Sequence, residues 1–131
     1  MTKIKIGGRE IELVFNLDSW IELGDNGLSI ANMDELIGAE AVKEHEGDVI
    51  RRIITLARIL GNQGEELAGR ERDLTDEGLR KLLRPAQVLH LKIAVINEIN
   101  KGMGMETKEK KEGEERDLVL EEINQKKTAS D

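Results

Sequence analysis

The chain begins with a stretch in which apolar and charged side chains alternate on both sides of a glycine pair. The letters KIKIGGREIEL place aliphatic residues at every second position, a period typical of strands with one buried face. A two-residue turn at Gly7-Gly8 suits the positive φ angles that hairpin turns need. It pairs these positions across the strands: Lys3 with Glu12, Ile4 with Ile11, and Lys5 with Glu10. We expect an antiparallel hairpin covered by helices, since an isolated hairpin is marginal in water.

The most apolar segment of the chain spans residues 85–105 and reads PAQVLHLKIAVINEINKGMGM. On a helix, a little over half of the circumference is covered by aliphatic side chains, namely Val88, Leu89, Leu91, Ile93, Val95, Ile96 and Ile99. Pro85 suits the first turn of a helix and Gly102 suits its end. We expect this helix to lie at the centre of the fold, in contact with several other elements.

Most of the remaining chain has the apolar periodicity and capping residues of helices. We predict a helix over 17–23 capped by Asn16, one beginning after Asn32, one over 49–60 between Asp48 and Gly61-Asn62, and one from Thr75 to Leu83. Residues 64–73 are charged and contain glycine, so they predict a loop. The expected fold class is α+β, with an N-terminal two-stranded β-hairpin packed against four to five α-helices in one compact domain over residues 1–105.

The composition changes after Met105. Residues 106–116 are nearly all charged, which is typical of a solvated linker. Within 117–127 a few apolar residues are spaced so that they can form a short amphipathic helix, which is too short to be stable alone. We therefore expect residues 106–131 to form a charged, flexible and disordered C-terminal tail, whose segment 117–127 folds only against a partner or against the domain.

Charge and composition narrow the function classes. The chain has 131 residues, with 20 Lys plus Arg against 27 Asp plus Glu, a net charge of −7. This acidic balance argues against non-specific nucleic-acid binding, which depends on phosphate neutralisation. The chain has no cysteine, which excludes disulfides and thiolate metal sites. There is no apolar signal region and no apolar run near the roughly 20 residues needed to span a bilayer, so we expect a cytoplasmic protein without membrane contact.

No arrangement of residues points to catalysis. His45 and His90 are the only histidines, and neither has a metal-type spacing with another strong ligand. The side chains of Glu44, His45 and Glu46 would diverge by about 100° per residue on a helix. No serine or threonine lies in a nucleophile or phosphate-binding motif. We expect no enzyme activity, no catalytic residue, no metal site and no cofactor.

Seven arginines leave a nucleic-acid alternative open: Arg51, Arg52, Arg58, Arg70, Arg72, Arg80 and Arg84. The helices within 76–101, joined with almost no loop, can be interpreted as a helix-turn-helix, so a DNA-binding transcriptional regulator is one hypothesis. The second helix is very apolar for a recognition helix, and the usual glycine-containing turn is absent. Arginines that solvate the outer faces of helices explain the pattern more simply.

The order of elements resembles a known family. A KIKIGGREIELVF hairpin is followed by a WIELG-containing helix, an LTDEGLRKLL helix and an AVINEINKGM helix before a charged tail. Over residues 3–105 this pattern resembles the tail assembly chaperones of long-tailed bacteriophages, of the siphophage or prophage type. The resemblance implies a small α+β domain that binds the long helical tape measure protein and recruits tail tube protein subunits. It also implies action in the host cytoplasm, absence from the mature virion, and for many members a longer frameshifted form.

The family has no catalytic residues, so the candidate site consists of partner contacts. Chaperones of apolar helices use adaptable aliphatic and methionine side chains, and this chain offers Met103, Met105, Leu118, Leu120 and Ile123. The alternative interpretation is that the methionines cover the core and the tail is a spacer. The edges of a two-stranded hairpin also favour a homo-oligomer. A minor structural protein of the tail remains a further hypothesis.

Overall fold

The computed structural model describes residues 2–104 and has the α+β fold class that the sequence predicts. Two strands, β1 (Thr2–Ile6) and β2 (Arg9–Leu13), form an antiparallel hairpin at the N-terminus. Lys3 pairs with Glu12, Ile4 with Ile11, and Lys5 with Glu10, so the predicted register is confirmed. Gly7 and Gly8 both have positive φ, at 59° and 81°, as the two-residue turn requires.

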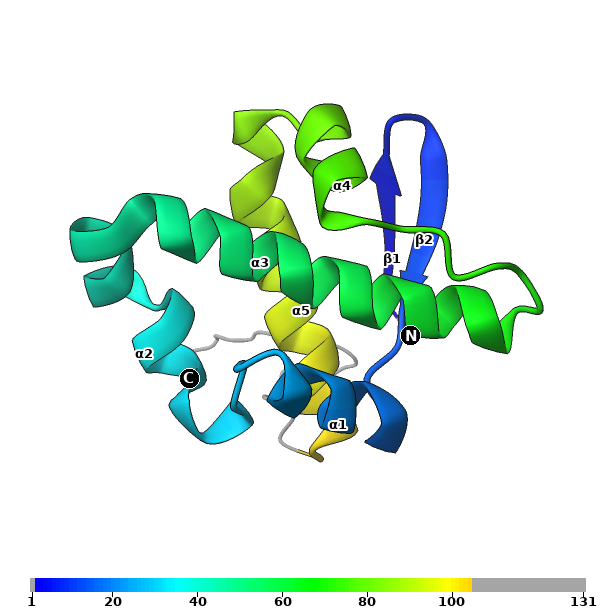
Figure 1. Cartoon of the computed structure of the whole chain (residues 1–131), viewed down its shortest axis with the longest axis horizontal. Helices are drawn as coiled ribbons and strands as arrows, with labels where there is room; N and C mark the ends of the chain where they lie inside the picture. Colours follow the sequence, from blue (N-terminus) through cyan, green and yellow to red (C-terminus); the bar gives the residue numbers. More distant parts are fainter. Residues whose placement is uncertain (1, 105–131) are drawn as a thin grey trace, which may run out of the picture.

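Helical elements account for most of the rest of residues 2–104. In chain order they are α1 (Leu17–Asp25), the 3₁₀ turn η1 (Ile30–Asn32), α2 (Met33–Ile37), α3 (Ala39–Leu67), α4 (Asp76–Leu82) and α5 (Pro85–Gly102). The hairpin packed against helices is therefore as expected (Figure 1). The expected disordered tail over 106–131, with its helix over 117–127, lies outside the described residues.

The central element is α3, and the prediction that α5 would be central is wrong. Helix α3 crosses the molecule and contacts β2, α1, α2, α4 and α5 (Figure 1). Most of the apolar side chains in its second half are fully or nearly fully buried, including Ile53, Leu56 and Leu60. Helix α5 packs on α3 and β1 through one face only, and Leu89 and Ile93 on its other side are 62% and 49% exposed. The apolar arc of α5 is wider than the surface that covers it.

The predicted end of the third helix at Gly61-Asn62 is also wrong, because α3 continues to Leu67. Gly61 and Gly64 are buried where the hairpin crosses the helix. A Cβ at position 64 would overlap the carbonyl oxygen of Glu12, so glycine permits close approach of β2 to the helix. Tertiary packing therefore keeps helical a segment whose glycines and asparagine resemble a stop signal.

The beginning of α3 differs from the prediction too. The helix begins at Ala39, and Asp48 lies inside it and is not its N-cap. A local break occurs at His45, whose φ of −144° and ψ of 53° are not helical. Within residues 2–104, no helix is long and apolar enough to cross a membrane.

Candidate protein-binding surface

Helix α1 carries three large apolar side chains that the fold leaves exposed. Leu17, Trp20 and Ile21 are 72%, 43% and 63% exposed. They occupy positions i, i+3 and i+4, so they share one side of the helix, and Gly24 follows on the next turn. A contiguous exposed apolar patch of this kind on a small domain marks a candidate interaction site.

The orientation of this patch follows from how α1 is held at its beginning. Asn16 and Ser19 form a reciprocal capping box, with the Ser19 N–H donating to Asn16 Oδ1 at 3.0 Å and the Asn16 N–H donating to Ser19 Oγ at 2.8 Å. The buried Ser19 hydroxyl also donates to the Val14 carbonyl at 3.1 Å. Together with the fully buried Leu23, these contacts fix which side of α1 meets the core. Leu17 and Ile21 are left on the solvent side.

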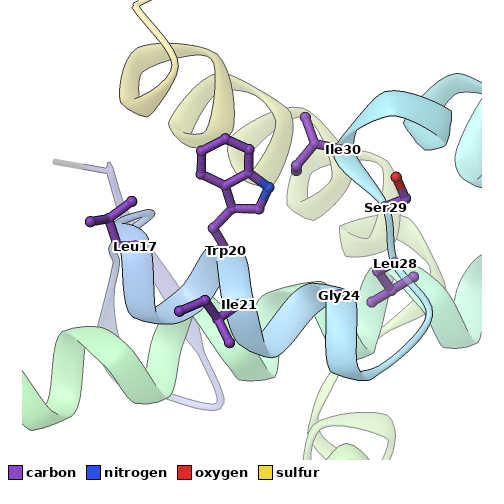
Figure 2. A pocket seen from close by; sticks show the side chains of 7 residues that line it. All are labelled: Leu17, Trp20, Ile21, Gly24, Leu28, Ser29 and Ile30. Carbon is purple, nitrogen blue, oxygen red and sulfur yellow. The ribbon is translucent and has the colours of Figure 1, made fainter.

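A shallow hollow of about 310 Å³ lies beside this side of α1 (Figure 2). We call it the α1 hollow, and its lining is Leu17, Trp20, Ile21, Gly24, Leu28, Ser29 and Ile30. The Trp20 indole projects from α1 toward Ile30 (Figure 2). Trp20 also contacts the buried Phe15, with ring centroids 6.1 Å apart and planes tilted by 42°, a geometry typical of favourable aromatic pairs.

A second hollow adjoins the first through Ile30. This α2–α5 groove, also of about 310 Å³, is lined by Ile30, Met33, Asp34, Ile37, Gly38, Ala39, Lys92, Ile96, Ile99 and Asn100. Its lining is largely apolar, with Asp34, Lys92 and Asn100 as the polar side chains. The exposed Ile93 lies one turn before Ile96 on α5, so apolar surface continues along that helix.

The structure places one of the predicted partner-contact residues, Met103. Its backbone N–H caps α5 by donating to the Ile99 carbonyl, and its side chain is half-buried against the core. The other four, Met105, Leu118, Leu120 and Ile123, lie outside the described residues. The exposed side chains of Leu17, Trp20 and Ile21, which we call the α1 patch, were not among the contact residues predicted from the sequence. With Gly24, they have the spacing of one helix face. That spacing does not show whether the face is covered.

Four of the seven arginines of the DNA-binding hypothesis, Arg51, Arg58, Arg70 and Arg72, are paired with carboxylates. Arg58 Nε donates to Asp76 at 2.7 Å, and Arg72 donates to Glu22 at 2.8 Å. The Glu22 carboxylate raises the pKa of Arg72, mainly through this hydrogen bond. Arg70 binds Glu65, and Arg51 binds Asp48. Phosphate binding by these four arginines would have to break existing ion pairs, whereas Arg80 and Arg84, the two within 76–101, are exposed.

Both histidines lie on the surface. His45 is at the break in α3 and His90 is on the exposed side of α5. Across residues 2–104, no group of three or more His, Asp or Glu side chains is placed to hold a metal ion.

Comparisons with protein-family models, curated proteins and solved structures found no match for this chain. The α1 patch and its two neighbouring hollows form the candidate protein-binding surface of the described residues.

Proposed function

We propose that this protein is a tail assembly chaperone of a long-tailed phage or prophage, which binds the tape measure protein and aids tail tube assembly in the host cytoplasm. It acts through protein–protein contacts without catalysis and is absent from the mature virion. The observation that carries this proposal is the exposed apolar side of α1, with Leu17, Trp20 and Ile21 beside the α1 hollow. The resemblance of residues 3–105 to these chaperones supplies the identity of the partner.

The geometry suits a helical partner. An amphipathic helix presents apolar side chains at i, i+3 and i+4, and it binds to surfaces that offer matching aliphatic and aromatic groups. Trp20 supplies a large rigid contact, and the hollow beside it accepts a side chain of the partner. The adjoining α2–α5 groove extends the apolar surface beyond one side chain.

The size of the surface suits a chaperone that must release its client. Burial of each large apolar side chain is worth about 1.5–3 kcal/mol. Association costs about 4–15 kcal/mol in lost translational and rotational freedom. Three exposed side chains with two shallow hollows therefore support weak, reversible binding at each contact, and a long helical client would engage several copies of the chaperone.

The test is co-expression with the tape measure protein from the same gene cluster. The wild-type chain should raise the soluble fraction of that protein. The double variant Leu17→Lys/Ile21→Lys should lose this effect and keep its fold, because both side chains are mostly exposed. Leu67→Lys is the matched control, since Leu67 is 61% exposed at the end of α3 and lines neither hollow. Unchanged aggregation with the wild-type chain would overturn the proposal.

Two other functions make different predictions. A DNA-binding regulator would give a salt-sensitive gel shift, and the arginine–carboxylate pairs described above make this the weaker candidate. A minor structural tail protein could use the same apolar surface. It would be found in purified virions, whereas a chaperone would not.

A further inference from the structure

Helix α5 ends beside α1. The backbone of Gly102 lies against Phe15 so closely that a Cβ there would overlap the phenyl ring. Phe15 in turn packs against Trp20. Met103 is half-buried against the core next to this point. The end of α5 at Gly102 is therefore connected to Trp20 and the α1 hollow through a single side chain, that of Phe15.

The sequence beyond this point contains a segment that matches the patch. Residues 117–127 read DLVLEEINQKK. At about 100° per residue, Val119, Leu120 and Ile123 fall on one side of a helix and Leu118 falls on another. An isolated helix of this length is not stable in water. A helix over 117–127 would be stable only where a surface covers its apolar side.

The connection is long enough to bring this segment back to α1. Residues 105–116 connect the described region to this segment, and an unstructured chain of that length would have an r.m.s. end-to-end distance of roughly 20 Å, at 5–6 Å × √n. This distance exceeds the separation of Gly102 from Trp20, which are linked by contacts with the one side chain of Phe15. Tethering through a short linker gives an effective concentration in the millimolar range, so even a weak contact would be populated.

The charge at one end of the segment is complementary to α1, while Asp117, Glu121 and Glu122 lie toward its other end. Helix α1 carries the exposed carboxylates Asp18 and Asp25 at either end of its apolar side. The segment 117–127 ends on Lys126-Lys127. A basic end placed near an acidic helix favours one orientation of the docked segment.

We propose that residues 117–127 fold back as a short helix onto the α1 hollow of their own chain, with Val119, Leu120 and Ile123 against Trp20 and its neighbours. The docked segment covers the surface that the tape measure protein would use, and the client displaces it. This regulatory consequence rests on the proposed function, whereas the docking itself does not. The tail would then act as an intramolecular competitor that keeps the free chaperone from self-association.

Trp20 is the sole tryptophan of the chain and reports directly on the docking. In the full-length protein, Leu120→Lys/Ile123→Lys should shift its emission to the red and increase its quenching by acrylamide. Leu118→Lys, on the other side of the segment, should leave both unchanged. Equal effects of the two variants, or none from either, would overturn the docking. If dilution of the protein made Trp20 more accessible to acrylamide, the contact would be with a second copy of the chain. That result would also overturn the intramolecular docking.

A second measurement separates this inference from the proposed function. If the docking holds, Leu120→Lys/Ile123→Lys should solubilise the tape measure protein better than the wild type, because the competitor is removed. Equal solubilisation by both chains would overturn the regulatory role and leave the chaperone function intact. If Trp20 is protected but the wild-type chain solubilises nothing, the docking stands and the chaperone function fails.

Discussion

The side-chain amide of Asn62 forms hydrogen bonds with both the carbonyl and the N–H of Leu74. Its Nδ2 donates to the Leu74 carbonyl at 3.0 Å, and its Oδ1 accepts from the Leu74 N–H at 3.0 Å. Both residues are buried, and Leu74 lies in the extended stretch before α4. The amide of Asn62 thus replaces the strand partner that this stretch lacks and ties the 70–75 segment to α3.

We predict that Asn62→Ala lowers the free energy of unfolding by about 3 kcal/mol, because two buried backbone groups lose their partners. Asn97→Ala on the exposed side of α5 is the control and should stay within about 0.5 kcal/mol of the wild type. Urea denaturation followed by circular dichroism measures both. An Asn62→Ala value as small as that of the control would show that solvent satisfies these groups.

The close approach of α3 to β2 gives a second prediction. Gly64→Ala places a Cβ onto the Glu12 carbonyl oxygen, a backbone atom that cannot rotate away, so we expect a loss of about 3 kcal/mol. Gly24→Ala in α1 meets no atom within 4 Å and should instead stabilise the helix by up to about 1 kcal/mol. Thermal denaturation of the two variants checks the opposite signs, and destabilisation of equal size would contradict the packing argument.

The hairpin could be predicted from the sequence to the level of its register. Alternation with a period of two fixes which side chains share a face, and the glycine pair at Gly7-Gly8 fixes the turn length. No sequence pattern of comparable strength shows which helix lies at the centre of the fold. Both α3 and α5 carry broad apolar arcs, and Gly61 and Gly64 resemble a helix stop until β2 is placed against them.

The candidate site was harder to predict for a related reason. An amphipathic helix shows its apolar positions in the sequence, but the elements that cover them come from elsewhere in the chain. Leu23 is buried and Leu17 is exposed on the same helix, and the difference depends on where α3 lies. The buried carboxylate of Glu65 was missed because residues 64–73 predict a loop and because Arg9, one of its two arginine partners, is distant in the sequence.

The buried carboxylate of Glu65 makes stability depend on pH. Two hydrogen bonds from Arg70, with a further one from Arg9, hold the pKa of Glu65 below its ordinary value of 4.5, against the opposing effect of burial. A depressed pKa means that the unfolded chain binds the proton more readily. The resulting stabilisation is complete above the ordinary value and is lost as the pH falls through the folded-state pKa.

We therefore predict that Glu65→Gln is less stable than the wild type at neutral pH and that the gap narrows as the pH falls from about 5 to about 3. Asn97→Ala, which removes no titratable group, is the control, and its difference from the wild type should not change with pH. Urea midpoints across this pH range provide the measurement. A gap that stayed constant with pH would contradict the ion-pair explanation.

The last prediction concerns Glu98, which connects α5 to both ends of the hairpin. Its Oε1 accepts from the Thr2 N–H at 3.2 Å and from the Thr2 hydroxyl at 2.9 Å, and its Oε2 accepts from the Phe15 N–H at 3.4 Å. Glu98→Ala should cost about 2–4 kcal/mol, because donors around a buried carboxylate lose their acceptor.

Thr2→Val removes only the hydroxyl contact to Glu98 and should cost about 1 kcal/mol. In the double variant with Glu98→Ala the two losses should not add, since they share one contact. Hydrogen exchange at the Phe15 amide is the local measurement and should accelerate in Glu98→Ala but not in Thr2→Val, because only the former removes its acceptor. Additive losses with unchanged Phe15 exchange would mean that Glu98 acts on α5 alone. Since Phe15 supports Trp20, faster Phe15 exchange should be accompanied by a change in Trp20 fluorescence, which connects this buried carboxylate to the α1 patch.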